Sequence, residues 1–416
     1  MRKILVIGGV DIIGGAARVG WDIAAYLPKD KYSIKFIVGR KMSNSKDVYE
    51  LKRNPFLKKV DSLTGKNISG LSRQFSSFIL ANDIDRGASE EILGHHWYKE
   101  ADLVHCHNLH GNFFRLDTLS KMANEKPVVW TLHDMWAITS HCAHCYECKN
   151  FNNGRHFTTG FGRYGSILWN NSEYLWNKKK SVYRKSKKLN IVVPSLWLEQ
   201  KVKSSILKRK PLTIINNGVD INIFKPRNKN KIRNELKLPL KKKIIIYVGQ
   251  GGALDPRKGG QFFLQVASRL VTEKEIDLLC IGGTIERKPV RKGNIIYTPQ
   301  IKDKETMSKY YSLADILLFP SLAENFPLVT LEALASGLPI VSFDVGGVKE
   351  QVKHRLNGYI ARYKNTKDLI KGVKFILELD KKDLERMENR NRHKAVKRYS
   401  LSNMAKKYLD LYEKII

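Results

Sequence analysis

The sequence is poor in cysteine and has no long hydrophobic run. Five cysteines among 416 residues are too few for the disulfide framework of a small secreted domain, so we expect reduced thiols. The longest apolar runs, at 244–248 and 316–320, are far shorter than the roughly 20 residues of a membrane-spanning helix. The N-terminus leads into a strand-like run without a signal peptide. These absences predict a cytoplasmic protein without a membrane-spanning segment.

The G-x-G-x-x-G fingerprint of dinucleotide-binding proteins is also absent. Gly8-Gly9 and Gly14-Gly15 instead bracket a wide loop between the first expected strand and the helix after it. This spacing argues against a dehydrogenase that transfers hydride.

Acidic residues are scarce relative to basic ones. The chain has 74 Lys and Arg against 40 Asp and Glu, a net charge of +34, which predicts attraction to phosphate-bearing partners or anionic lipid. The excess is spread over both halves of the chain. Its densest run, Lys178 to Lys188, is expected to form a solvated face.

Apolar residues are plentiful enough for globular domains, because hydrophobic residues make up 42% of the chain. The length predicts two domains or three. Short β-branched runs alternate with helical stretches, as in parallel sheets covered on both faces. We therefore predict the α/β class, with two doubly wound domains in tandem and the active site in the cleft between them. The expected strands are 3–7, 33–38, 103–107, 128–132 and 191–193, and then 243–248, 276–281, 294–297, 316–319 and 340–343.

Domain boundaries follow from the gap between these two series of strands. The first domain is expected to cover residues 1–208 and the second 209–399. A last helix at about 400–416 is expected to pack back on the first domain.

Three of the cysteines are separated by two residues each, as Cys142-x-x-Cys145-x-x-Cys148. This spacing suits thiolate ligands of a structural zinc ion. No fourth ligand is evident, so a zinc site, a disulfide and unmodified cysteines on a loop are the alternatives.

The most informative stretch, 320–339, follows an expected buried strand and reads as loop, helix and next strand. Asn325 is the expected helix cap, Pro327 suits the first turn, and Gly337 suits the helix end. The helix start would attract a diphosphate.

Glu324 and Glu332 in the same stretch can accept hydrogen bonds from sugar hydroxyls, one from a hexose and the other from a ribose. The alternative is two solvated glutamates beside an ordinary helix. Arg257-Lys258-Gly259 follows another expected strand through the glycine-rich segment 249–252. Glycines let a backbone approach a phosphate closely, and Lys258 supplies a point charge for it.

Thr131-Leu132-His133-Asp134 ends a further expected strand, so His133 would project into the same cleft. There an imidazole can donate a hydrogen bond to a sugar oxygen or move a proton. A structural role is the alternative for His133, and it is the favoured reading for His105, His107 and His110.

These motifs resemble those of retaining glycosyltransferases of the GT-B fold, in glycosyltransferase family 4 (group 1). The resemblance spans nearly the whole chain and rests on Gly14-Gly15, His133, 217–220, 257–259 and the pair Glu324 and Glu332. The stretch 132–139 and the cysteines after it resemble the branch that builds bacterial extracellular or capsular polysaccharide.

The resemblance implies a fold of two Rossmann-like domains facing each other across a cleft. It implies transfer of a sugar from a nucleotide sugar to a hydroxyl of a glycan or lipid-linked saccharide, with retained anomeric configuration and no catalytic metal or cofactor. His133 and Glu324 would contact the donor sugar, Lys258 the diphosphate and Glu332 the ribose, with His133, Glu324 and Lys258 as catalytic residues. The donor site would comprise Gly14, Gly15, Arg257, Lys258, Glu324, Asn325, Phe326, Leu328, Val329 and Glu332.

Two residues depart from the family pattern. Gln250 stands where many members have an arginine that would bind phosphate, and Pro327 replaces a frequent glycine.

Acceptors in this branch are commonly linked to polyprenyl diphosphate, so the basic charge predicts peripheral contact with the anionic inner membrane face. Residues 68–84 are either an interfacial helix or a core helix. Two rivals are a nucleic-acid-binding protein that uses its basic surface and a sugar-nucleotide epimerase of the same fold. No recognised nucleic-acid module is present, so no nucleic-acid partner is expected.

Overall fold

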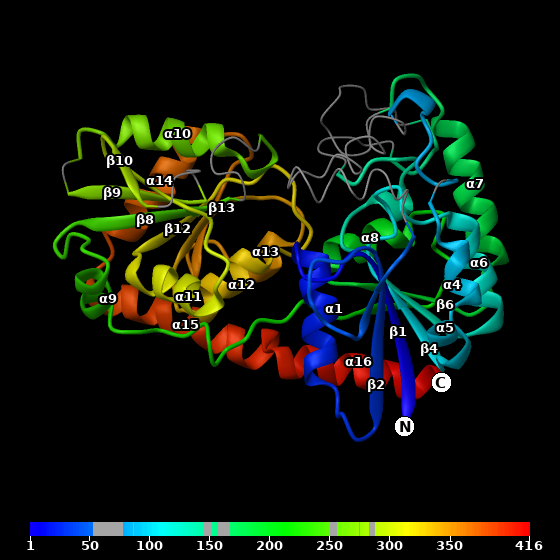
Figure 1. Cartoon of the computed structure of the whole chain (residues 1–416). Coiled ribbons are helices and arrows are strands. Elements are labelled where there is room, and N and C mark those ends of the chain that lie inside the picture. Colours follow the sequence, from blue (N-terminus) through cyan, green and yellow to red (C-terminus); the bar gives the residue numbers. More distant parts are fainter. Residues whose placement is uncertain are drawn as a thin grey trace. The chain divides into compact units, whose positions relative to one another are not determined.

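The computed structural model describes residues 1–52, 78–85, 87–144, 151–155, 167–249, 256–273, 275–282 and 288–416 (Figure 1). Contacts divide the chain into two compact units, Met1–Asn216 with Ala405–Ile416, and Asn217–Met404. The boundaries expected from the sequence, near 208 and 399, lie a few residues N-terminal to these.

The described part of the first unit contains a seven-stranded sheet with the order β3-β2-β1-β4-β5-β6-β7. All neighbouring strands are parallel. Strands β4 and β5 are buried along their whole length, as expected for inner strands of a covered parallel sheet. The strands are β1 (Arg2–Val10), β2 (Tyr32–Arg40), β3 (Val48–Glu50), β4 (Leu103–Cys106), β5 (Val128–Thr131), β6 (Leu189–Val193) and β7 (Leu212–Ile214).

Helices connect these strands, and their starts differ. α8 has a side-chain cap, because Ser195 Oγ accepts the N–H of Leu198 at 3.0 Å. α1 instead begins after Gly14, which has a φ of 91° and offers no side chain as a cap. The described helices are α1 (Gly15–Tyr26), α4 (Glu90–Gly94), α5 (His96–Glu100), α6 (Leu116–Glu125), the 3₁₀ turn η1 (Trp136–Ile138), α7 (Ser172–Lys185), α8 (Leu196–Lys203) and α16 (Leu401–Ile415).

α16, the last helix, belongs to the first unit from Ala405 onward. Tyr408 lies 3.0 Å from Thr131 Oγ1, and Tyr412 lies 2.7 Å from His105 Nδ1, measured from each phenol oxygen. The C-terminal segment is therefore anchored to β4 and β5 by buried hydrogen bonds.

The second unit contains, in its described part, a sheet with the order β10-β11-β9-β8-β12-β13-β14. Only β10 runs antiparallel to its neighbour there. The strands are β8 (Lys243–Val248), β9 (Ile276–Ile281), β10 (Val290–Lys292), β11 (Ile295–Thr298), β12 (Ile316–Phe319), β13 (Ile340–Phe343) and β14 (Gly358–Ala361). The described helices are α9 (Lys229–Glu235), the 3₁₀ turn η3 (Pro256–Lys258), α10 (Gly260–Arg269), α11 (Lys304–Leu313), α12 (Leu328–Ala335), α13 (Val348–Gln351), α14 (Thr366–Leu377) and α15 (Lys381–Tyr399).

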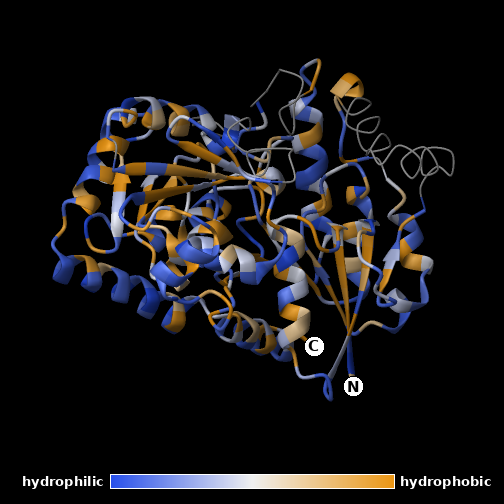
Figure 2. Cartoon of the chain, turned by 60° about the vertical axis from the view of Figure 1, so that its left-hand side comes forward, coloured by the Kyte–Doolittle hydropathy of each residue, from blue (hydrophilic) through white to orange (hydrophobic). Residues whose placement is uncertain are grey.

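The expected strands are confirmed in both units, and they are coloured mainly as hydrophobic in Figure 2. Four described strands were not predicted: β3, β7, β10 and β14. Each is an edge strand of three or four residues. An edge strand has a single neighbour and is often kept short, so its sequence carries only a weak periodic signal.

Both sheets reverse their strand order at one point. The chain places β2 and β3 on one side of β1 and then returns to β4 on the other, and it likewise places β9 and β11 on one side of β8 before β12. In open α/β sheets, ligands bind outside the carboxyl ends of the strands at such a point. Candidate sites therefore lie after β1 and β4, and after β8 and β12.

Residue Asn325 is not the cap of α12, contrary to the sequence prediction. The helix begins at Leu328 with Pro327 in the cap position. The backbone carbonyl of Asn325 instead accepts the N–H of Gly347 at 2.8 Å, which holds it in the preceding loop. The predicted end is confirmed, since Gly337 follows the helix with a φ of 78°.

The basic run on α7 is not simply a solvated face. Lys179 is fully buried, and its Nζ donates to the carbonyls of Trp136 at 2.6 Å and Thr139 at 3.1 Å. Nζ also lies 3.7 Å from the centroid of the Trp136 ring. Burial lowers the pKa of Lys179 to about 8. This lysine fastens the segment that follows β5.

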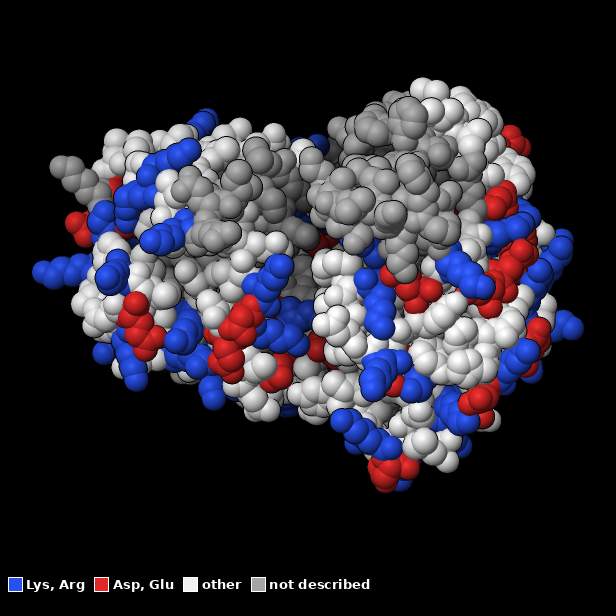
Figure 3. All heavy atoms as spheres, in the orientation of Figure 1, with Lys and Arg blue, Asp and Glu red and all other residues white. Residues whose placement is uncertain are grey.

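Basic residues do not gather in one patch on the face shown in Figure 3, where Lys and Arg are interleaved with Asp and Glu. None of the described helices combines the length and apolar character that a membrane span requires. Most of the segment 68–84 lies outside the described residues, so an interfacial helix there stays a prediction.

Candidate active site

The loops after β8 and β12 bring Lys258 and Glu324 into direct contact. Lys258 Nζ lies 2.6 Å from Glu324 Oε1. The two side chains are only 19% and 9% exposed, so the ion pair is poorly screened by solvent. A cation and a carboxylate with hydrogen-bonding capacity thus stand together at the point where the strand order reverses.

Backbone contacts fix these two loops against each other. The N–H of Leu322 donates to the carbonyl of Arg257 at 2.8 Å. Gly259 has a φ of 71°, and a Cβ on it would fall 1.8 Å from the carbonyl oxygen of Pro320. Only glycine permits this approach, so Lys258 is held next to the loop that carries Glu324.

The loop after β13 supports the same place from another side. Gly346 has a φ of 53°, and a Cβ on it would fall 1.8 Å from the carbonyl oxygen of Glu324. Gly347 donates its N–H to Asn325. The backbone of Glu324 is therefore enclosed by loops that follow three neighbouring strands.

Helix α12 starts directly after this cluster. It has neither a side-chain cap nor an acidic residue in its first turn, so its own residues do not offset the positive end of its dipole. Glu332 in this helix is buried, and its Oε2 accepts the Tyr311 hydroxyl at 2.8 Å. This bond orients the carboxylate. Glu332 is therefore not a solvated glutamate, which was the alternative that the sequence left open.

The side chains around the start of α12 pack against the core of the unit and do not project into solvent. Asn325 and Phe326 are buried, and Leu328 and Val329 are partly buried against the core of the unit. Asn217 Nδ2 donates to the carbonyl of Phe326 at 2.8 Å. Contacts from these four to a ligand would therefore come largely from backbone atoms.

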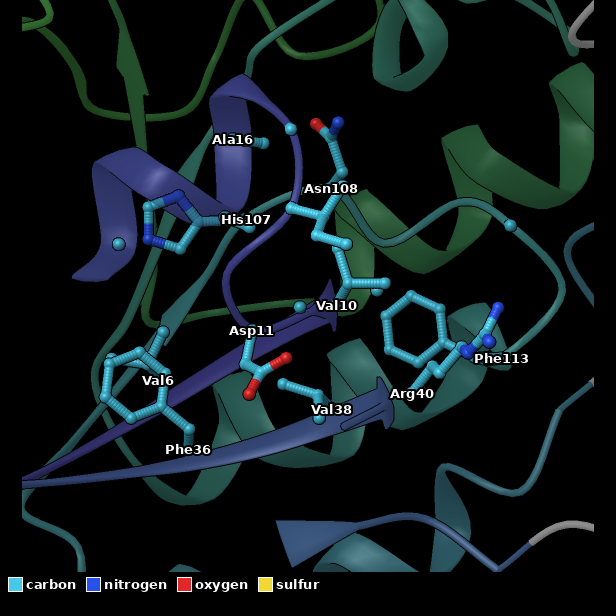
Figure 4. Close-up of a pocket in the computed structure, with 18 of the residues that line it drawn as sticks. Val6, Val10, Asp11, Ala16, Phe36, Val38, Arg40, His107, Asn108 and Phe113 are labelled. Carbon is cyan, nitrogen blue, oxygen red and sulfur yellow. The ribbon is translucent and has the colours of Figure 1, made fainter. Parts of the chain in front are cut away.

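The first unit has a cavity of about 300 Å³ at the carboxyl ends of β1 and β2. Figure 4 shows Asp11, Arg40, His107 and Asn108 around it. Gly14 and Gly15 line it at the start of α1, a helix with no acidic residue in its first turn.

Asp11 secures one side of this cavity. It is buried, and its carboxylate accepts the N–H of Met42 at 2.8 Å and of Ser43 at 2.9 Å. The loop after β1 is thereby tied to the loop after β2.

Histidines form a connected cluster behind the cavity. His133 Nε2 lies 2.8 Å from His107 Nδ1, and the two rings stack at a centroid distance of 5.1 Å. His107 lines the cavity, and its Nε2 is buried without a partner in the described structure. His133 therefore contacts the cavity wall only through His107 among the contacts of the described residues.

His110 and Asp134 form a second pair at the same edge. His110 Nε2 lies 2.7 Å from Asp134 Oδ2, and Asp134 Oδ1 accepts the N–H of Trp136 at 2.9 Å. Burial alone would raise the pKa of Asp134, but the adjacent His110 and these hydrogen bonds lower it to about 2. The carboxylate is ionised at neutral pH and orients His110, which lines the cavity.

Acidification is expected to destabilise the first unit. Burial lowers the pKa of His105 to about 3 and of His133 to about 4. An unfolded chain protonates both near pH 6.5, so their neutral form contributes stability above that pH, and this is lost as pH falls toward 4. We expect the free energy of unfolding to drop by about 1.4 kcal/mol per pH unit per histidine below pH 6.

Urea unfolding followed by tryptophan fluorescence measures this effect, because all seven tryptophans lie between positions 21 and 197, within the first unit. His133→Gln should flatten the pH dependence. An unfolding midpoint that is unchanged from pH 7 to pH 5 would contradict the expectation.

The structure groups the sequence candidates by unit. Lys258 and Glu324 are in contact, and Arg257 is joined to the same loop through its carbonyl. Gly14 and Gly15 border the cavity of the first unit, and His133 lies behind it. Asp11 and Arg40 were missed, although each lies at or directly after the end of a strand, the signal that identified the others.

The cysteine cluster is described only in part. Cys142 is buried, with its Sγ 3.7 Å from His141 Nδ1. Cys145 and Cys148 lie outside the described residues, as does Gln250. Among the residues described, no group of three or more His, Cys, Asp or Glu is arranged to hold a metal ion.

Solved structures with a similar fold cover nearly the whole chain. Sucrose-phosphate synthase from Thermosynechococcus elongatus matches with a TM-score of 0.68 and 18% identity, over 100% of this chain and 99% of that one. HepE from Anabaena, in complex with UDP and glucose, matches with a TM-score of 0.65 and 14% identity, over 99% and 100%. The two Rossmann-like units are those of a GT-B glycosyltransferase.

Sequence comparison gives the family. Residues 13–223 match Glycosyltransferase Family 4, and residues 228–394 match Glycosyl transferases group 1. The chain belongs to this family of glycosyltransferases. It is also 24% identical over 357 residues to WcaC of Escherichia coli, a glycosyl transferase assigned by its name to colanic acid biosynthesis, with 81% of this chain and 82% of that protein covered.

Proposed function

We propose that the protein is a retaining glycosyltransferase that moves a sugar from a nucleotide sugar to a hydroxyl of a saccharide acceptor. The observation that carries the proposal is the contact of Lys258 with Glu324 at 2.6 Å, beside the start of α12. A cation and an uncompensated helix start suit a diphosphate, and a carboxylate suits sugar hydroxyls.

Each residue would have a distinct role. Lys258 would neutralise the diphosphate as the bond from the anomeric carbon to the phosphate oxygen breaks, an electrostatic effect. Glu324 would accept hydrogen bonds from hydroxyls of the donor sugar once the diphosphate binds Lys258. Glu332, oriented by Tyr311, would accept hydrogen bonds from the ribose hydroxyls. His133 would contact the donor sugar.

The reaction we infer is a substitution at the anomeric carbon on the face from which the diphosphate leaves. The acceptor oxygen forms the new bond, and its proton passes to the departing phosphate oxygen. The products are the lengthened saccharide and the nucleoside diphosphate. No external oxidant, reductant or metal ion takes part in this scheme.

The acceptor is proposed to be a glycan or lipid-linked saccharide in cell-surface polysaccharide synthesis. The match to WcaC over most of both chains supports this class. The net charge of +34 would favour a place at the anionic inner face of the membrane.

A panel of UDP-, GDP- and ADP-sugars tests the donor assignment by thermal shift. A ligand that binds only the folded state stabilises it by about 2.7 kcal/mol at one hundred times its Kd. We expect one nucleotide class to raise the melting temperature and Lys258→Ala to remove most of that rise. UDP is the first candidate, because HepE binds it. The proposal would be wrong if none of the three classes stabilised the protein.

Product analysis then tests the mechanism. The anomeric proton coupling of the product, read by NMR, distinguishes retention from inversion, and EDTA in the same reaction tests the need for a metal ion. Inversion, or loss of turnover with EDTA while the protein stays folded, would overturn the mechanism proposed here.

A further inference from the structure

The cavity of the first unit is lined by one cationic side chain that has no ion-pair partner among the described residues. Arg40, the last residue of β2, lines this cavity and is half-buried. It forms no ion pair or side-chain hydrogen bond with any described residue. A half-buried guanidinium normally pairs with a carboxylate or phosphate, whose geometry its planar fork matches.

Asp11 lines the same cavity but is not the ion-pair partner of Arg40. Its two carboxylate oxygens accept the backbone N–H groups of Met42 and Ser43. These bonds hold the segment directly after Arg40, so Asp11 supports the position of the arginine without pairing with it.

A further feature favours a ligand that carries negative charge. The start of α1 borders the cavity at Gly14 and Gly15, and its helix dipole favours negative charge. Asn108 and His110 also line the cavity, and the rest of the lining is glycine backbone and apolar side chains such as Phe113. Its volume of about 300 Å³ lies at the lower end of the range for small-molecule sites.

We propose that this cavity holds the acceptor and that Arg40 recognises an oxyanion on it, either the carboxylate of an acidic sugar or the phosphate of a sugar phosphate. The inference rests on the proposed function, because it assigns the acceptor side of that reaction. Arg40 is then a specificity-determining residue that distinguishes acidic from neutral saccharides.

The test uses the full-length protein saturated with UDP, so that the donor site is occupied. Calorimetry measures the binding of glucuronate, glucose 1-phosphate and glucose to the wild type, Arg40→Gln and Arg209→Gln. Glucose is the neutral reference, and the two anions distinguish the carboxylate from the phosphate. Arg209 is an exposed arginine of the same unit that does not line the cavity, so its variant removes the same charge elsewhere.

We expect at least one of the anions to bind the wild type about tenfold more tightly than glucose, as a charge-assisted bidentate contact would give. Arg40→Gln should abolish that preference, and Arg209→Gln should retain it. The inference is overturned if the wild type shows no preference for either anion, or if Arg40→Gln keeps it. Failure of UDP to bind would instead contradict the proposed donor site, while the comparison of the two variants still decides the role of Arg40.

Discussion

Replacing Lys258 or Glu324 with alanine is expected to lower the rate of sugar transfer by about 10² to 10³, the range seen when one preorganised electrostatic group is removed from an active site. The two side chains are in contact and largely shielded from solvent. Alanine at 258 removes the charge that would stabilise the departing diphosphate. Alanine at 324 removes the acceptor of hydroxyl hydrogen bonds and leaves the lysine without its described partner.

Initial rates at saturating donor, together with the melting temperature of each variant, measure the effect and separate it from misfolding. Lys309→Ala is the matched control, because Lys309 Nζ lies 3.0 Å from Glu235 Oε2 in an exposed pair of the same unit. Exposed pairs contribute about 0–1 kcal/mol, so this control should transfer sugar normally. Rates within a few-fold of wild type for both Lys258→Ala and Glu324→Ala would reject the assigned site.

Gly346→Ala is expected to destabilise the second unit by about 3 kcal/mol or more and to abolish transfer. The φ of 53° alone disfavours alanine by about 1–2 kcal/mol. The new Cβ would also lie 1.8 Å from the carbonyl oxygen of Glu324, an overlap that only a backbone shift can relieve. That shift would displace Glu324 from Lys258.

Gly293→Ala separates the conformational penalty from the collision. Gly293 has a φ of 60°, but a Cβ on it would have nothing within 4 Å. This control should lose only about 1–2 kcal/mol and keep its transfer rate. Urea unfolding and the transfer assay of both variants check the expectation. Equal losses of unfolding free energy and of transfer rate in the two variants would show that the overlap with Glu324 has no effect.

Much of the architecture was predictable because the inner strands are buried on both faces. Ile316–Phe319 and Ile340–Phe343 are wholly buried, so nearly every position must be apolar and the run stands out in the sequence. Edge strands such as β3 and β10 lack that requirement and were missed. The cap of α12 was misplaced because a contact with Gly347, distant in the sequence, holds Asn325 in the loop.

The candidate site was predictable where its residues directly follow inner strands. Lys258 and Glu324 are 66 residues apart, yet β8 and β12 are neighbours, so parallel strands place the loops after them at one edge. The glycine-rich loop before α1 was recognised for the same reason.

The amino-acid sequence determined which segments form the inner strands of the two sheets and which loops follow them, because apolar runs and the alternation of strands with helices are local properties. Only the tertiary structure decided that Lys258 pairs with Glu324, that Lys179 is buried beneath Trp136, and that Arg40 lines a cavity without a described partner. Those outcomes depend on side chains from distant segments competing for the same space and the same hydrogen bonds, and no single segment encodes the result.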